Sequence, residues 1–240
     1  MIGEHSSKQY DHDLEAIRSK VLLMGGIVET QFTDAMTCFR VGDIEGADRV
    51  IAGDDDVNQL EVSLDDACSH LIVRRQPAAN DLRTVMATIK VITDLERIGD
   101  EAAKIARTSK NLHSRGVVAV HHFEMVRTIA HETSDMLHDA LDAFARLDGK
   151  QALALIARDA VIDHEFRSIM RNLITFMMED PRTISSAIDT LWVAKAIERI
   201  GDHAKNIAEY VIYVVEGKDI RHTRLPTQSA RPAAIPPVTP

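Results

Sequence analysis

The chain has 240 residues, of which 45% are hydrophobic and 27% are charged, and this length can bury one large core or two ordinary ones. Its formal net charge of −9 argues against broad binding to nucleic-acid phosphates, which needs a basic surface, and suits divalent cations or basic partner surfaces better. Aromatic residues make up only 4%, and glycine and proline are few before residue 220, so an all-α fold is expected rather than a sheet-rich one.

The first half of the chain predicts a short tail and three long helices. We expect residues 1–10 to form an N-terminal tail, and helices to cover residues 11–40, 44–75 and 79–114. Pro77 falls between the second and third helices, because proline ends a preceding helix and is tolerated in the first turn of the next one. Gly25 and Gly26, inside the first helix, mark either a kink or a close contact with another helix.

The second half repeats this pattern after Gly116. Three further helices are expected over residues 118–147, 151–179 and 183–216, and Pro181 stands at the equivalent break, 104 residues after Pro77 (181 − 77). Such long helices joined by short turns form antiparallel bundles. We therefore predict an all-α fold of six long antiparallel helices, arranged as two tandem three-helix bundles related by an internal repeat. The repeats span residues 11–116 and 117–222, and the proline-rich residues 223–240 are expected to be a disordered tail.

The pentapeptide ERIGD occurs once in each repeat, at Glu96–Asp100 and at Glu198–Asp202. On a helical wheel its isoleucine, Ile98 or Ile200, lies at the centre of the apolar stripe, and its two acids fall on the opposite side. The acids are four residues apart, so each pair lies on one face within reach of a common cation. Glu96, Asp100, Glu198 and Asp202 are therefore candidate metal ligands.

The helix before each ERIGD helix also carries polar oxygens at a four-residue spacing. These residues are Asp54 and Asn58 in the first repeat and Asp159 and Asp163 in the second. If the two helices pack antiparallel, their oxygens meet those of ERIGD across a groove, and such a set suits Mg, Mn, Ca or Fe. Asn58 carries no charge, although Glu61 is placed to compensate, so we expect the second groove to bind a cation better.

Simpler interpretations remain open for these acids. Two acids four apart on a helix are usually solvent-exposed decoration, and only their recurrence in both repeats favours a function. A ferritin-like di-iron site needs Glu-x-x-His, which the sequence lacks. His203 follows Asp202 and is either an accessory ligand or, as we expect, a surface histidine. Arg97 and Arg199 are expected at the surface or paired with a neighbouring acid, and Trp192 is expected to pack near the middle of its helix.

The cysteines and the N-terminus indicate a soluble cytoplasmic chain. Cys38 and Cys68 form no C-x-x-C pattern and are expected to be reduced core thiols. The N-terminus lacks the apolar stretch of a signal peptide, and no apolar run approaches the ~20 residues that span a bilayer. Direct membrane insertion and nucleic-acid binding are therefore not expected.

The repeat and its motifs resemble the PhoU family. The resemblance covers residues 13–222 and is carried by the segments MGGIVE, RRQPAANDLR, DLERIGDEAAKIAR, MMEDPR and IERIGDHAKNIAEYVIYVVEGKDIRH. It implies a cytoplasmic, non-enzymatic negative regulator of the phosphate regulon and of phosphate uptake. Such a protein is an adaptor between the ATPase subunit of the phosphate ABC transporter and a membrane sensor histidine kinase, and is commonly a homodimer.

The resemblance also implies metal ions, namely iron, manganese, magnesium or zinc, on the acidic motifs. Carried over by position, the ligand set is Glu96, Asp100, Glu198, Asp202, Asp159, Asp163, Asp54 and Asn58, with no catalytic residue. One alternative is a carboxylate-bridged metal-binding or metal-storage bundle with enzymatic activity. Another is a purely structural helical scaffold whose acids only face solvent.

Overall fold

The computed structural model describes residues 3–116 and 120–220, and within these ranges every long element is a helix. The helices are α1 (Gly3–Val41), α2 (Ile44–Arg75), α3 (Ala79–Ser114), α4 (Val120–Arg146), α5 (Gly149–Glu179) and α6 (Ile184–Glu216), with a short 3-10 turn, η1 (Pro181–Thr183), before α6. The all-α prediction is confirmed.

The helix boundaries follow from local capping. Asp43 precedes α2 and accepts a hydrogen bond from the backbone N–H of Gly46, and Asp148 caps α5 in the same way through the N–H groups of Lys150 and Gln151. Gly217 ends α6 with a φ of 72°, a left-handed conformation that glycine adopts without strain. These signals explain why five of the six helices begin and end close to the predicted residues.

The predicted N-terminal tail is wrong for most of its length. Residues 3–10 continue α1 rather than preceding it. Tyr10 is buried, and its hydroxyl donates a 3.1 Å hydrogen bond to the backbone carbonyl of Asp81 on α3. This contact anchors the beginning of α1 to the start of α3, before the apolar pattern that set the predicted boundary.

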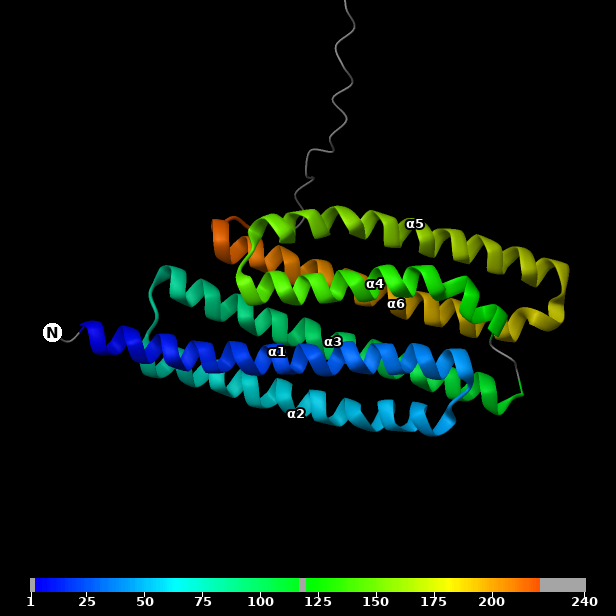
Figure 1. The fold of residues 1–240 in the computed structure, drawn as a ribbon, viewed down its shortest axis with the longest axis horizontal. Helices are drawn as coiled ribbons and strands as arrows, with labels where there is room; N and C mark the ends of the chain where they lie inside the picture. The colour runs from blue at the N-terminus through cyan, green and yellow to red at the C-terminus, as the bar shows by residue number, and fades with distance from the viewer. Residues whose placement is uncertain (1–2, 117–119, 221–240) are drawn as a thin grey trace, which may run out of the picture.

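The six helices form two three-helix bundles that share one core. Helices α1–α3 make the first bundle and α4–α6 the second, and α2 and α5 lie on the outer edges of the molecule (Figure 1). Helices α3 and α6 pack against each other along the middle, and α1 packs against α4. The buried apolar side chains of both bundles form a single continuous cluster. The tandem repeat is therefore one folded unit.

Gly25 marks a close helix contact. Helix α1 continues through it without a break. A Cβ built on Gly25 would lie 2.7 Å from Cδ2 of Leu141 on α4. The absence of a side chain here lets α1 and α4 approach closely, which joins the first bundle to the second.

Trp192 departs from expectation, because 64% of its side chain is exposed on α6 rather than packed. Cys38 and Cys68 are buried and free, as predicted. In the described ranges, no helix is both long and apolar enough to cross a membrane. The expected proline-rich tail, residues 223–240, lies outside the described residues.

Candidate functional site: two carboxylate grooves

The ERIGD segments present their isoleucines to the core, as the helical wheel predicts. Ile98 and Ile200 are fully buried. Glu96 is partly exposed at the rim, whereas Glu198 is only 9% exposed. Glu198 is therefore more enclosed than a side chain on a solvent face would be.

Helices α2 and α3 pack side by side, and the line along which they meet, which we name the first carboxylate groove, carries Asp54, Asn58, Glu61, Asp65, Glu96 and Asp100. The α2 residues follow a 4-3-4 spacing, which keeps them on one face of the helix. The helices approach closely at Gly99, where an added Cβ would lie 3.3 Å from Cγ1 of Val57 and 3.5 Å from Oδ1 of Asp54. Glycine at this position thus brings the α2 oxygens to the ERIGD segment.

The carboxyl groups of this groove disfavour one another's ionisation. Burial raises the pKa of Asp54, and the charge of Asp100 raises it further. Burial also raises the pKa of Glu96, with added contributions from Glu61 and Asp100. The pKa values of Glu61 and Asp65 are raised as well, mainly by burial. Four carboxyl groups with raised pKa values therefore line one groove.

Cations compensate this charge only weakly. Arg107 Nη2 lies 3.6 Å from Oδ2 of Asp54, and Lys104 Nζ lies 3.9 Å from Oδ2 of Asp100. Among the residues that the structure describes, the buried Oδ1 atoms of Asp54, Asn58 and Asp65 have no hydrogen-bond partner. Buried polar atoms without partners are rare in folded proteins and are costly, so these oxygens are available to a ligand.

Helices α5 and α6 form the second carboxylate groove, which contains Asp159, Asp163, Glu198 and Asp202. Here lysines already bind two of the acids. Lys205 Nζ lies 2.5 Å from Oδ2 of Asp159, and Lys195 Nζ lies 2.5 Å from Oε2 of Glu198.

The other two acids of the second groove differ from each other. Asp163 pairs at 3.0 Å with Arg167. Burial raises the pKa of Asp202, and the charges of Glu198 and Asp159 add to that rise. Because lysine and arginine neutralise three of its four acids, this groove attracts a further cation less than the first does. The ion pairs and pKa shifts thus favour cation binding in the first groove. The uncharged Asn58 had led us to expect stronger binding in the second.

His203 is not a surface histidine. Only 7% of it is exposed, and its Nδ1 lies 2.6 Å from Oδ1 of Asp94 on α3, which also accepts a 3.2 Å hydrogen bond from the side chain of Asn206. Arg199 also forms an ion pair between these helices: its Nη1 lies 2.9 Å from Oε1 of the buried Glu101 on α3. His203 and Glu101 occupy equivalent places in the repeat, and both pair across the interface between α3 and α6.

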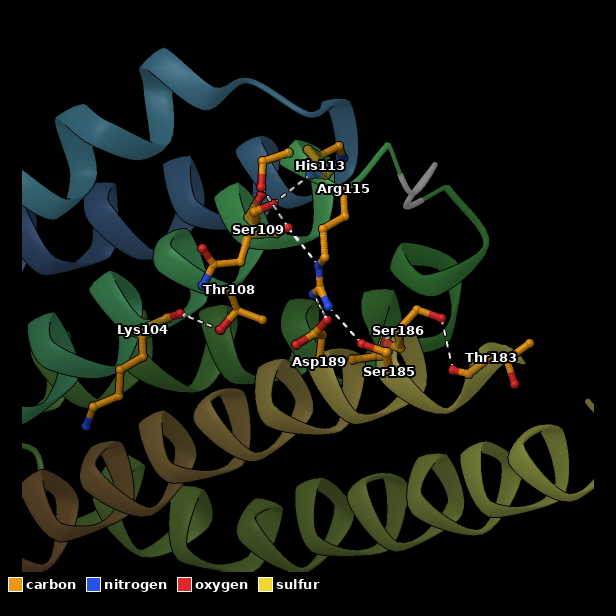
Figure 2. Close-up of polar contacts among 12 residues, drawn as sticks. Lys104, Thr108, Ser109, His113, Arg115, Thr183, Ser185, Ser186 and Asp189 are labelled. Carbon is orange, nitrogen blue, oxygen red and sulfur yellow. Dashed lines mark hydrogen bonds and ion pairs between the residues drawn. The ribbon is translucent and has the colours of Figure 1, made fainter. Parts of the chain in front are cut away.

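Arg115 connects the same two helices at one end (Figure 2). It caps the C-terminus of α3, and its guanidinium donates a 2.7 Å hydrogen bond to the hydroxyl of Ser185 and pairs with Asp189. Both partners lie near the start of α6. The polar groups between the bundles therefore fix how α3 and α6 lie against each other, and with them the two grooves.

The donor chemistry of the first groove fits a hard cation, because it offers carboxylate and amide oxygens and no cysteine. The positions of these side chains fit a bound metal ion less well than their chemistry does. Among residues 3–116 and 120–220, the structure gathers no set of three or more His, Cys, Asp or Glu side chains close enough to hold a metal ion. The predicted ligands are thus brought to shared grooves without converging on one point.

Sequence reasoning missed Asp65 and Gln31. Asp65 completes the 4-3-4 spacing on α2. This spacing is the sequence signal from which Asp65 could have been predicted. Gln31 reaches the groove from α1, and its buried Oε1 would lie 3.3 Å from a Cβ on Gly99. No spacing within α2 or α3 could indicate a residue contributed by a third helix.

Replacing Glu96 with glutamine is expected to stabilise the protein at neutral pH. A carboxyl group whose folded pKa is raised contributes stability below its ordinary pKa, and loses that contribution as pH rises through the raised value. Removing the charge should therefore raise Tm at pH 7, by about 2–4 °C for each kcal/mol of repulsion relieved. The gain should shrink as pH falls toward 4.5, the ordinary pKa of the side chain.

The matched control is Glu198→Gln, measured in the same thermal melts. It deprives Lys195 of its partner carboxylate while relieving the repulsion between Glu198 and Asp202, so Tm should rise less than in Glu96→Gln. A drop in Tm at pH 7 for both variants would contradict the account of the first groove.

Comparisons with known proteins place the fold and its repeat. The family model described as "PhoU domain" matches residues 21–109 and 126–211, one match in each bundle. The chain belongs to the PhoU family. A PhoU protein of Serratia marcescens is 48% identical over 223 residues, which cover 92% of this chain and 90% of that protein. The Escherichia coli K12 PhoU protein is 45% identical over 221 residues, covering 92% of this chain and 91% of its own.

Solved structures of PhoU proteins have the same fold as this chain. The crystal structure of PhoU from Pseudomonas aeruginosa superposes with a TM-score of 0.84 at 44% identity, over 87% of this chain and all of that one (100%). The Streptococcus pneumoniae PhoU structure gives a TM-score of 0.80 at 26% identity, over 88% and 98% of the two chains. The two-bundle architecture is therefore the PhoU fold over nearly the whole length of its relatives.

Proposed function

We propose that the protein is a cytoplasmic, non-enzymatic regulator of phosphate uptake. The observation that carries this proposal is similarity over almost the full length to proteins named "Phosphate-specific transport system accessory protein PhoU", at 48% and 45% identity. The solved Streptococcus pneumoniae relative is described as a phosphate transport system regulatory protein. Conservation of both repeats and of the whole fold supports a shared role.

The proposal includes an adaptor mechanism. The protein acts as a homodimer that contacts the ATPase subunit of a phosphate transporter and a membrane sensor histidine kinase, and it keeps phosphate-starvation genes off when phosphate is plentiful. Long exposed helix faces and a net charge of −9 suit docking on basic partner surfaces.

Deleting the gene and following a phosphate-regulated reporter tests this function. At high phosphate the reporter should become active in the deletion strain, and the wild-type gene supplied in trans should silence it again. A reporter that stays silent in the deletion strain would reject the regulatory role.

We further propose that the first carboxylate groove binds a hard metal ion such as iron, manganese or magnesium. Support comes from four carboxyl groups with raised pKa values and from the partnerless buried oxygens of Asp54, Asn58 and Asp65. A cation would neutralise this mutual repulsion, and Glu96 and Asp100 would meet it from α3. The second groove would bind more weakly, because its lysines must first be displaced.

Thermal melts with each metal test this site. At 100 times its Kd, a cation that binds only the folded chain adds about 2.7 kcal/mol of stability. The gain should vanish in Asp54→Asn/Glu96→Gln and persist in Glu15→Gln/Asp66→Asn, whose acids are exposed outside the groove. Equal gains in both variants would exclude the first groove as the site, and so would the absence of any gain in the wild-type chain.

A further inference from the structure

The groove between α1 and α2 has two hollows, one at each end. It differs from the first carboxylate groove, which α2 forms with α3, although Gln31 of α1 reaches both. The hollow nearer the α1–α2 turn has a volume of about 620 Å³, and the hollow at the far end has about 400 Å³. Together they make one long open face on the first bundle.

The far end of this face is basic. Lys20 of α1 and Arg74 of α2 line its hollow, and both are exposed. In the part of the chain that the structure describes, neither forms an ion pair. Ile17 and Leu71, which are 5% and 4% exposed, form an apolar floor between them. In a chain with a net charge of −9, two unpaired cations over an apolar floor suit an acidic occupant.

The end nearer the turn is acidic. Asp34 of α1 and Asp56 of α2 line its hollow, both are exposed, and neither pairs with a cation of the described residues. Leu23 and the partly exposed Ile27 also line this hollow, on its side toward the basic end, and Leu23 leaves 60% of its side chain exposed. The face thus has an apolar middle flanked by opposite unpaired charges.

We propose that this α1–α2 face is where a second copy of the chain docks, reversed about a two-fold axis. Lys20 and Asp34 are 14 residues apart and Arg74 and Asp56 are 18 apart, so the charged ends lie about 21 and 27 Å apart at 1.5 Å per residue. A reversed copy then places its acidic end on the basic end of the first, and the Leu23–Ile27 segments meet near the middle, because Ile27 lies midway between Lys20 and Asp34. Such self-complementarity is what an isologous interface requires.

The corresponding face of the second bundle lacks this pattern. Arg158 of α5 lies 2.7 Å from Asp139 and 3.5 Å from Glu132, both on α4. The charge of Arg158 is thus neutralised within the chain itself. This contrast favours α1–α2 over α4–α5 as the docking face.

The inference rests on the homodimer included in the proposed function and assigns its face. Sedimentation across the micromolar range measures association of the full chain. Lys20→Glu/Arg74→Glu makes both ends acidic, and Asp34→Lys/Asp56→Lys makes both ends basic. Each variant alone should dimerise at least about tenfold more weakly than the wild type. Lys150→Glu/Arg171→Glu, with the same charge change on α5, should dimerise normally.

The decisive experiment mixes Lys20→Glu/Arg74→Glu with Asp34→Lys/Asp56→Lys. An equimolar mixture should regain a dimer that contains one copy of each, because every acidic end then meets a basic one. Circular dichroism and thermal melts confirm that all variants are folded, as expected for changes at exposed positions. A wild-type dimer that neither variant weakens would reject this face and leave the homodimer standing, whereas a wild-type monomer would reject both.

Discussion

Replacing Ile98 with aspartate is expected to lower the free energy of unfolding by about 4 kcal/mol or more, the largest effect of any single change proposed for this chain. Ile98 is fully buried in the core that the two bundles share. The substitution loses the burial of an isoleucine and places a carboxylate where no partner is available. Denaturant unfolding followed by circular dichroism measures the change.

Asp202→Ala is the matched control, because it changes a residue of the other ERIGD copy. Burial and the charges of Glu198 and Asp159 already disfavour ionised Asp202. Its removal should therefore leave stability within about 0.5 kcal/mol of the wild type, or raise it. If Asp202→Ala lowered the free energy of unfolding more than Ile98→Asp, one assignment would be wrong: that the ERIGD isoleucine faces the core and the ERIGD acids face away from it.

Replacing Asp94 with alanine is expected to cost about 3 kcal/mol, because it breaks a buried polar pair between the bundles. Asp94 is 2% exposed and accepts contacts from His203 and Asn206 on α6. His203 Nε2 has no hydrogen-bond partner in the described part of the chain, so the loss of Asp94 leaves both ring nitrogens of a buried histidine unsatisfied. Thermal unfolding should show the fall in stability.

Two further variants separate the pair from general packing. Asp94→Asn retains an oxygen acceptor and should cost less than Asp94→Ala. In the double variant Asp94→Ala/His203→Leu, no unpaired imidazole remains, so the losses should be less than additive. Strict additivity of the single changes would show that Asp94 and His203 are not energetically coupled.

The sequence predicted most of the fold because its signals are local. Capping aspartates, the two equivalent prolines and the apolar stripe around each ERIGD isoleucine act within a few residues. The packing at the start of α1 was missed because Tyr10 contacts Asp81, a residue of a helix far away in the chain, which no local signal indicates. The environment of His203 was missed for the same reason, since its partner lies 109 residues away.

The candidate site was predicted in outline but not in its electrostatics. Spacing indicated which acids share a helix face, and the antiparallel packing of α2 and α3 brings them together. Spacing could not show that Lys195 and Lys205 neutralise the second groove while the first keeps its mutual repulsion. That difference depends on which long side chains fold back over a carboxylate, and it favours the first groove, whereas the sequence had favoured the second.

Retaining acids that repel one another is costly to stability, so a groove that serves no function would gain by losing them. We therefore propose that the first carboxylate groove serves regulation rather than folding. The most direct test is complementation of the deletion strain with Asp54→Asn/Glu96→Gln, with Tm and reporter activity measured on the same variant. We predict a protein at least as stable as the wild type that fails to silence the phosphate-regulated reporter at high phosphate. A variant of equal stability that silences the reporter fully would contradict the claim.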